Sequence, residues 1–86
     1  MPELCRFYGI IIRMFWEDHP PPHFHAIYGT HEALIEIASA DIIAGSLPTG
    51  ARSLVRQWAE LHRDELMHDW DLARTLQPLQ SIEPLP

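Results

Sequence analysis

The hydrophobic pattern divides the chain into a first half typical of β-strands and a second half typical of an α-helix. Residues 6–16 are rich in β-branched and aromatic side chains, including three consecutive isoleucines, as in a strand buried on much of both faces. Residues 17–22 interrupt this run, because their three successive prolines cannot donate hydrogen bonds to a neighbouring strand. We therefore expect a first strand followed by a proline-rich loop.

Residues 23–28 and 31–37 are predicted to form the two arms of a β-hairpin. Gly29-Thr30 lies between them, and glycine at the first position of a two-residue loop suits a type II′ turn. Residues 41–44 are a candidate for a short further strand. The first half of the chain, from about residue 5 to residue 44, is therefore expected to form an antiparallel sheet of three to four strands.

The hairpin register predicts which side chains share a face of the sheet. A two-residue loop pairs Phe24 with Ile35, and these apolar side chains should meet the core. The same register places His23 directly opposite Glu36 on the other face, with His25 next along that face. We therefore expect two histidines and one glutamate to gather on the face away from the core.

In the second half, large or apolar residues recur every three or four positions, as on the buried face of an amphipathic helix. They are Ala51, Val55, Trp58, His62, Leu66, Trp70 and Ala73. We expect a helix over about residues 47–76 that is capped by Ser46. It is either continuous or interrupted near His68-Asp69, where Asp69 could cap a second segment. A short proline-rich tail follows over residues 77–86.

These elements predict a single α+β domain over residues 1–86, with the sheet packed against one long or kinked C-terminal helix. All six basic residues are arginine, against twelve acidic residues, and the net charge is −6. Nucleic acid is therefore an unlikely general partner, because its binding depends on neutralising phosphates. Cys5 is the only cysteine, so no intrachain disulfide can form. Without a long apolar N-terminal run, we expect a cytoplasmic protein with no membrane partner.

A cluster of histidines is the clearest sign of chemistry. Four of the six lie within thirteen residues: His19, His23, His25 and His31. A His-X-His pair on a strand can share a divalent metal such as zinc or manganese, and Glu36 or Asp18 could supply an oxygen ligand. The register favours His23, His25 and Glu36 as metal ligands, and the same three residues are candidates for catalytic proton transfer. Alternatively, the histidines only cover a half-exposed face and form hydrogen bonds with Glu36, Glu32 or the backbone.

Four segments of the chain resemble a known family. They are Cys5-Arg6-Phe7-Tyr8-Gly9-Ile10, Pro21-Pro22-His23-Phe24-His25-Ala26, Trp58-Ala59-Glu60-Leu61-His62-Arg63 and Ile82-Glu83-Pro84-Leu85. They look like the small bacterial proteins described as domain of unknown function 4160, and the resemblance spans nearly the whole chain. The family has no established activity, but its members are often encoded beside a second small protein, in an arrangement similar to a toxin–antitoxin pair. The resemblance therefore implies a partner protein encoded by a neighbouring gene, and it places His19 in a loop of variable sequence.

Three functions remain open from the sequence. The first is a non-enzymatic, protein-interaction component of a toxin–antitoxin-like module, docked on its partner or on a second copy of itself; small size and acidic charge favour it. The second is a small metal-dependent or histidine-based hydrolase, such as a ribonuclease-type toxin, that uses His23, His25 and Glu36. The third is a DNA-binding regulator, for which the second helical segment is poorly suited because its acidic residues outnumber its single arginine, Arg74.

Overall fold

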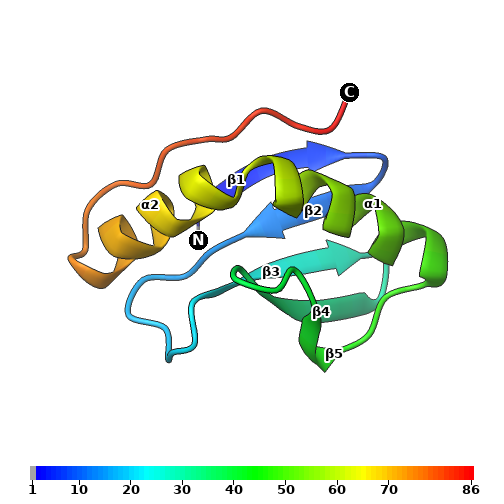
Figure 1. Cartoon of the computed structure of the whole chain (residues 1–86), viewed down its shortest axis with the longest axis horizontal. Coiled ribbons are helices and arrows are strands. Elements are labelled where there is room, and N and C mark those ends of the chain that lie inside the picture. Colours follow the sequence, from blue (N-terminus) through cyan, green and yellow to red (C-terminus); the bar gives the residue numbers. More distant parts are fainter. Residues whose placement is uncertain (1) are drawn as a thin grey trace.

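The computed structural model describes residues 2–86 and contains a sheet in which each strand pairs with the next along the chain (Figure 1). The strands are β1 (Glu3–Phe7), β2 (Ile10–Arg13), β3 (His23–Tyr28), β4 (His31–Glu36) and β5 (Ile42–Gly45). Two helices, α1 (Thr49–Leu61) and α2 (Arg63–Arg74), pack on one side of this sheet. The predicted α+β class is confirmed. The strands number five instead of three to four, with β5 near the candidate strand at residues 41–44.

The additional strand arises from a tight turn inside the apolar run at residues 6–16. Tyr8 and Gly9 have φ angles of 50° and 80°, and Phe7 pairs with Ile10 across the turn. Two consecutive positive φ angles between paired strands are those of a type I′ turn. The prediction of one continuous strand is therefore wrong. Tyr8 extended the apolar pattern in the sequence, although its side chain is 61% exposed at the turn.

The predicted register of the β3–β4 hairpin is confirmed. Gly29 has a φ angle of 59°, as the first residue of a type II′ turn requires. Phe24 pairs with Ile35, and both side chains are buried in the core. His23 pairs with Glu36, as the two-residue loop predicted. The hairpin alone therefore determines the strand positions of His23 and His25, without contacts from distant parts of the chain.

The helical half is interrupted earlier than the sequence suggested. α1 ends at Leu61 and α2 begins at Arg63, while His62 between them has φ −121° and ψ 26°, outside the helical range. Of the two possibilities that the sequence left open, an interrupted helix is confirmed, but the position considered for the break, near His68-Asp69, is wrong because both residues lie within α2. Two acidic residues in the first turn of α2 favour a new helix N-terminus at this point, since they complement the positive end of the helix dipole.

The start of α1 also differs from the expectation. Its N-cap is Pro48, with no side-chain capping bond, and the carbonyl oxygen of Pro48 accepts the backbone N–H of Arg52 at 2.9 Å. Ser46 instead donates its backbone N–H to the carbonyl oxygen of Glu32, 3.2 Å away, and so continues the pairing of β5 with β4. The predicted Ser46 cap is wrong for this reason. Within residues 2–86, neither helix is long and apolar enough to cross a membrane.

Trp58 of α1 occupies the centre of the core. Its side chain is fully buried, and its ring centroid lies 5.6 Å from the rings of Phe7 and Phe24. Aromatic pairs at such separations add to the stability that burial alone provides. These contacts fasten α1 to both β1 and β3.

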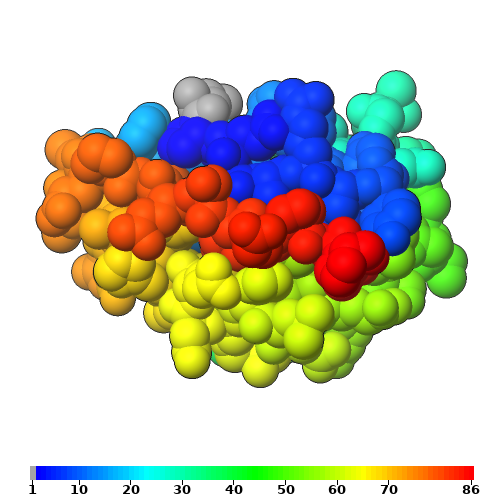
Figure 2. Space-filling model, turned by 90° about the horizontal axis from the view of Figure 1, so that it is seen from above, coloured from blue at the N-terminus to red at the C-terminus, as the bar shows by residue number. Residues whose placement is uncertain are grey.

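The C-terminal tail lies in the seam between the N-terminal strands and the helices, where Figure 2 shows it in red between blue and yellow. The backbone N–H of Ile82 donates to the carbonyl oxygen of Leu4 at 3.1 Å, so the tail covers the free edge of β1. The indole N–H of Trp58 donates to the carbonyl oxygen of Glu83 at 2.8 Å. The tail is therefore an integral part of the fold.

Candidate metal site

Two histidines of β3 meet one aspartate from the preceding loop at the end of the sheet. His23 Nε2 lies 3.0 Å from Asp18 Oδ2, and His25 Nε2 lies 3.2 Å from the same oxygen. The three residues offer ligand atoms that all lie within 4.8 Å of one another, so they could hold a metal ion. We call these three residues the His/Asp cluster.

Contacts with the end of α2 hold Asp18 in place. The indole N–H of Trp16 donates to the carbonyl oxygen of Gln77 at 2.9 Å, and the backbone N–H of Glu17 donates to the carbonyl oxygen of Ala73 at 3.4 Å. Asp18 Oδ1 accepts the backbone N–H of His19 at 2.9 Å. One carboxylate oxygen is thereby engaged locally, and the other is turned toward the histidines.

His23 is more deeply buried than its position on the outer face of the hairpin suggested. Its side chain is only 4% exposed, and its ring centroid lies 5.3 Å from that of Trp70 in α2. Its Nδ1 lies 2.8 Å from the carbonyl oxygen of Pro21. The expectation of a half-exposed face is therefore wrong at His23, because α2 reaches the beginning of β3.

His25 remains on the outer face, where it is 13% exposed. Its Nδ1 lies 3.0 Å from Glu32 Oε2 on β4, and its ring packs edge-on against Phe15 with centroids 4.3 Å apart. Glu32 pairs directly with Ile27, so it reaches His25 as a diagonal neighbour across the two strands. Both ring nitrogens of His25 therefore face carboxylate oxygens.

Neutral imidazole rings cannot donate a hydrogen bond to every acceptor that faces His23 and His25. A carbonyl oxygen only accepts, so the Nδ1 of His23 carries the hydrogen that it donates to Pro21. A neutral imidazole has one N–H, so the Nε2 of a neutral His23 would point a lone pair at Asp18, which is also an acceptor. The same conflict arises at His25 between Asp18 and Glu32. Positive charge between the three groups removes it, either as protons on both Nε2 atoms or as one bound cation.

Asp18 is a carboxylate in this environment. Burial alone would raise its pKa, but the hydrogen bond with His25, the backbone N–H of His19 and the charge of His23 together lower the pKa below its usual value. An aspartate with a lowered pKa is ionised at neutral pH, as a metal ligand must be.

The donor atoms of the cluster, two imidazole nitrogens and one carboxylate oxygen, are of the kind that binds divalent transition metals. Zinc–ligand bonds of about 2.0–2.1 Å, at angles between a right angle and a tetrahedral angle, separate ligand atoms by about 2.9–3.4 Å. The two histidine–aspartate separations, 3.0 and 3.2 Å, fall within that interval. Metal-binding histidines also usually donate their other ring N–H to a carbonyl or carboxylate, which is how the Nδ1 atoms of His23 and His25 are placed.

The predicted ligand set is only partly brought together. His23 and His25 meet as expected, but the carboxylate of Glu36 accepts the hydroxyl of Ser39 at 2.6 Å and is not part of the His/Asp cluster. Strand pairing set Glu36 opposite His23, but it did not determine which way the carboxylate turned. Asp18, considered in the sequence only as an alternative, takes this position.

The two remaining histidines of the sequence cluster lie outside the site. His19 is exposed in the loop, as expected, and His31 is exposed at the beginning of β4. Glu32 was considered only as a hydrogen-bond partner of the histidines, and the structure places it in that role beside His25. Trp70 was expected in the core, and nothing in the sequence indicated its contact with His23.

The fold and the cluster define a small α+β protein with a candidate metal site at one end of its sheet. Its sequence matches the family model described as Domain of unknown function (DUF4160) over residues 9–71. The chain therefore belongs to this family, and the matched range includes the whole His/Asp cluster. Neither the curated proteins nor the solved structures compared with the chain contain a match.

Proposed function

We propose that the protein binds a divalent transition metal, zinc or manganese, through His23, His25 and Asp18. The observation that carries this proposal is that both Nε2 atoms converge on one carboxylate oxygen while both Nδ1 atoms face acceptors. A metal removes the conflict between the facing lone pairs. It also avoids two adjacent imidazolium charges, one of them on the buried His23.

The chemistry that we propose for this metal is hydrolysis. Three protein ligands leave coordination positions free, as in catalytic zinc sites, whereas structural sites are closed by four. A metal held in this way supplies a Lewis acid that activates water. A cavity of about 240 Å³ adjoins Asp18 and is lined also by Trp70 and Arg74. The Arg74 guanidinium suits an anionic group, so a small anionic ester is the proposed substrate class.

A calorimetric zinc titration tests the metal. We expect one zinc per wild-type chain and a loss of affinity of at least about 100-fold in His25→Gln, which removes a ligand at the less buried of the two histidines. His31→Gln is the matched control, because His31 is an exposed histidine on the same hairpin. Circular dichroism confirms that each variant is folded. Equal zinc affinity in all three proteins would reject the metal site.

A second measurement tests the hydrolysis. Zinc-loaded protein is incubated with bis(p-nitrophenyl) phosphate and, separately, with RNA. We expect turnover of at least one substrate by the wild type and no turnover by His25→Gln. Arg74→Gln should bind zinc as tightly as the wild type but turn the substrate over more slowly. Zinc binding without turnover of either substrate would leave a metal-binding protein and reject the hydrolase.

Docking on a partner protein is a second candidate function, favoured by the sheet face that the helices leave uncovered. Ile11 pairs with Ile27 on this face, and Leu34 follows on β4; all three are only partly buried. We propose that a small protein encoded by a neighbouring gene, as in a toxin–antitoxin-like module, covers these side chains. Co-purification should succeed with the wild type and fail with Ile27→Glu, while Thr30→Glu in the exposed turn should leave the complex intact. A stable homodimer lost in Ile27→Glu would instead assign the face to a second copy of the chain.

A further inference from the structure

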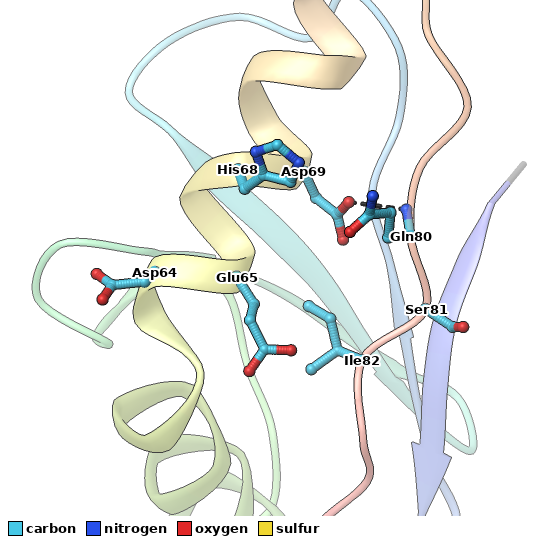
Figure 3. A pocket seen from close by; sticks show the side chains of 7 residues that line it. All are labelled: Asp64, Glu65, His68, Asp69, Gln80, Ser81 and Ile82. Atoms are coloured by element: carbon cyan, nitrogen blue, oxygen red, sulfur yellow. Dashed lines mark hydrogen bonds between the residues drawn. The ribbon is translucent and has the colours of Figure 1, made fainter.

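A second pocket lies between α2 and the C-terminal tail, and its chemistry differs from that of the His/Asp cluster (Figure 3). Its volume is about 240 Å³. Asp64, Glu65, His68 and Asp69 line it from α2, and residues 80–82 line it from the tail. Three carboxylates therefore surround a cavity that one end of the chain closes.

Asp69 is unusual among the residues of this pocket because it is a buried carboxylate. The residue is 1% exposed. Its Oδ1 accepts the backbone N–H of Gln80 at 2.8 Å, whereas its buried Oδ2 has no hydrogen-bond partner among the described residues. Figure 3 shows the carboxylate directed from α2 toward the tail. A buried carboxylate oxygen without a donor costs stability, so the fold retains here an acceptor that its own groups leave unsatisfied.

The other groups that line the pocket do not fully offset the cost of burying a negative charge on Asp69. Burial raises the pKa of Asp69, and the backbone N–H of Gln80 and the charge of His68 oppose the rise only in part. Glu65 is itself engaged, since its Oε1 lies 2.6 Å from the Nδ1 of His62. Any ligand of this pocket should therefore bring a positive charge and hydrogen-bond donors.

The size and spacing of the pocket favour an organic cation over a metal ion. Within residues 2–86, ligand atoms from three residues converge within 4.8 Å only at the His/Asp cluster, so the carboxylates of this pocket are too far apart to enclose one ion together. A guanidinium group spans wider gaps, because its planar fork carries five donors and is more weakly hydrated than an ammonium. The chain contains no lysine and only six arginines against twelve acidic residues.

We propose that this pocket binds the guanidinium group of an arginine side chain on a basic partner protein, with Asp69 Oδ2 as the central acceptor and Glu65 and Asp64 at the rim. Gln80 also lines the pocket, and its backbone N–H is the donor that reaches Asp69. The site is independent of the His/Asp cluster and requires no metal.

The test uses Nα-acetyl-arginine amide as the probe, titrated into the whole chain at low salt and followed by NMR. We expect saturable binding with shifts at residues 64–69 and 80–82, weakened at least about 10-fold in Asp69→Asn. The asparagine side chain of this variant keeps an oxygen acceptor for the Gln80 N–H, but it removes the charge and replaces the unpartnered Oδ2 with an NH2 group, which donates instead of accepting. Asp71→Asn is the matched control, because Asp71 is an exposed aspartate of α2 that lies outside the pocket.

Each other outcome has a defined meaning. Equal weakening by Asp69→Asn and Asp71→Asn would show general attraction to an acidic surface and overturn the proposal, as would binding that never saturates. Tighter binding of Nα-acetyl-lysine amide than of the arginine probe would overturn the choice of guanidinium. If Asp69→Asn does not fold, Glu65→Gln decides: an affinity equal to that of the wild type overturns the proposal, and a several-fold loss supports it.

Discussion

Asp18 is partly buried, with 23% of its side chain exposed, and Asp69 is fully buried, and the surroundings of the two aspartates act on them in opposite ways. Asp18 has one oxygen on a backbone N–H and the other between two imidazoles. Asp69 has one oxygen on a backbone N–H and the other without a donor in the described structure. Burial acts to raise the pKa of both, yet the pKa of Asp18 is lowered and that of Asp69 is raised. At Asp18 the neighbouring donors and charges together outweigh the effect of burial on the pKa, whereas at Asp69 burial prevails over them.

The two carboxyl groups suit different uses. Asp18 is held as an anion beside nitrogen ligands, which suits a metal site. Asp69 is held with an unmet acceptor beside a cavity, which suits an incoming donor. Substitutions that remove the carboxylate should therefore mainly change metal binding at Asp18 and the stability of the fold at Asp69.

The largest expected effect is on zinc binding by Asp18→Asn. The amide cannot supply the anionic oxygen of the site, so we expect zinc affinity to fall at least about 100-fold by calorimetry. Asp69→Asn removes the fully buried carboxylate of α2 and serves as the control, for which we expect an unchanged zinc affinity. A similar loss in both variants would mean that the two regions are not independent.

Glu32→Gln should have a smaller effect at the same site. The amide oxygen of the introduced glutamine still accepts the Nδ1–H of His25, but without the negative charge that makes the imidazole a stronger ligand. We expect zinc affinity to fall about 10-fold, as for other partners of metal-binding histidines. Glu36→Gln is the matched control on β4, because Glu36 contacts Ser39 instead of the cluster. A larger loss in Glu36→Gln would restore Glu36 as a ligand.

At the other aspartate, the effect should appear in stability. Asp69→Ala removes the acceptor of the Gln80 N–H and should lower the free energy of unfolding by about 1–2 kcal/mol at neutral pH. Asp69→Asn keeps that acceptor and should be more stable than the alanine variant by about 1 kcal/mol. Urea denaturation measures both. Equal stability of the two variants would show that the bond to the tail contributes nothing.

The smallest effect is a difference in pH dependence, measured by urea denaturation from pH 7 to pH 3 with a chelator present. Asp18 has a folded pKa below its unfolded value of about 3.9, so its stabilisation is present above that value and is lost as the pH falls through the folded pKa. Asp69 has a folded pKa above its unfolded value. Its cost is full above the folded pKa and disappears as the pH falls to the unfolded value.

Two variants separate these contributions to the pH profile. Asp18→Asn should reduce the loss of stability in acid, and Asp69→Asn should make that loss steeper, because it removes a group that favours the fold as the pH falls. Profiles that change in the same direction for both variants would contradict the opposite pKa shifts.

Much of the β3–β4 hairpin could be predicted because its determinants are local. Gly29 suits the turn, and the two-residue loop then fixes the pairing of His23 with Glu36. The β1–β2 turn was missed because Tyr8 belongs to an apolar run, and a residue in the left-handed region is hard to recognise without glycine at the first position. The helix interruption at His62 was misplaced for a related reason, since the apolar period continues through it.

The candidate site shows the same division. Alternation along β3 places His23 and His25 on the same face of the strand, and the sequence alone could determine this because side chains two residues apart share a face. Only the tertiary structure decided that Asp18, and not Glu36, completes the group. The loop that carries Asp18 is held by Ala73 and Gln77, more than fifty residues away in the chain.

What the sequence by itself determined is the α+β class, the hairpin register and the pair of histidines, all of which follow from turn chemistry and short-range periodicity. What only the tertiary structure decided is the third member of the cluster, the burial of His23 under Trp70, and the unmet acceptor of Asp69 beneath the tail. Each of these depends on side chains brought together from distant parts of the chain. Their contacts arise from packing the helices and tail onto the sheet, and no local pattern encodes that arrangement.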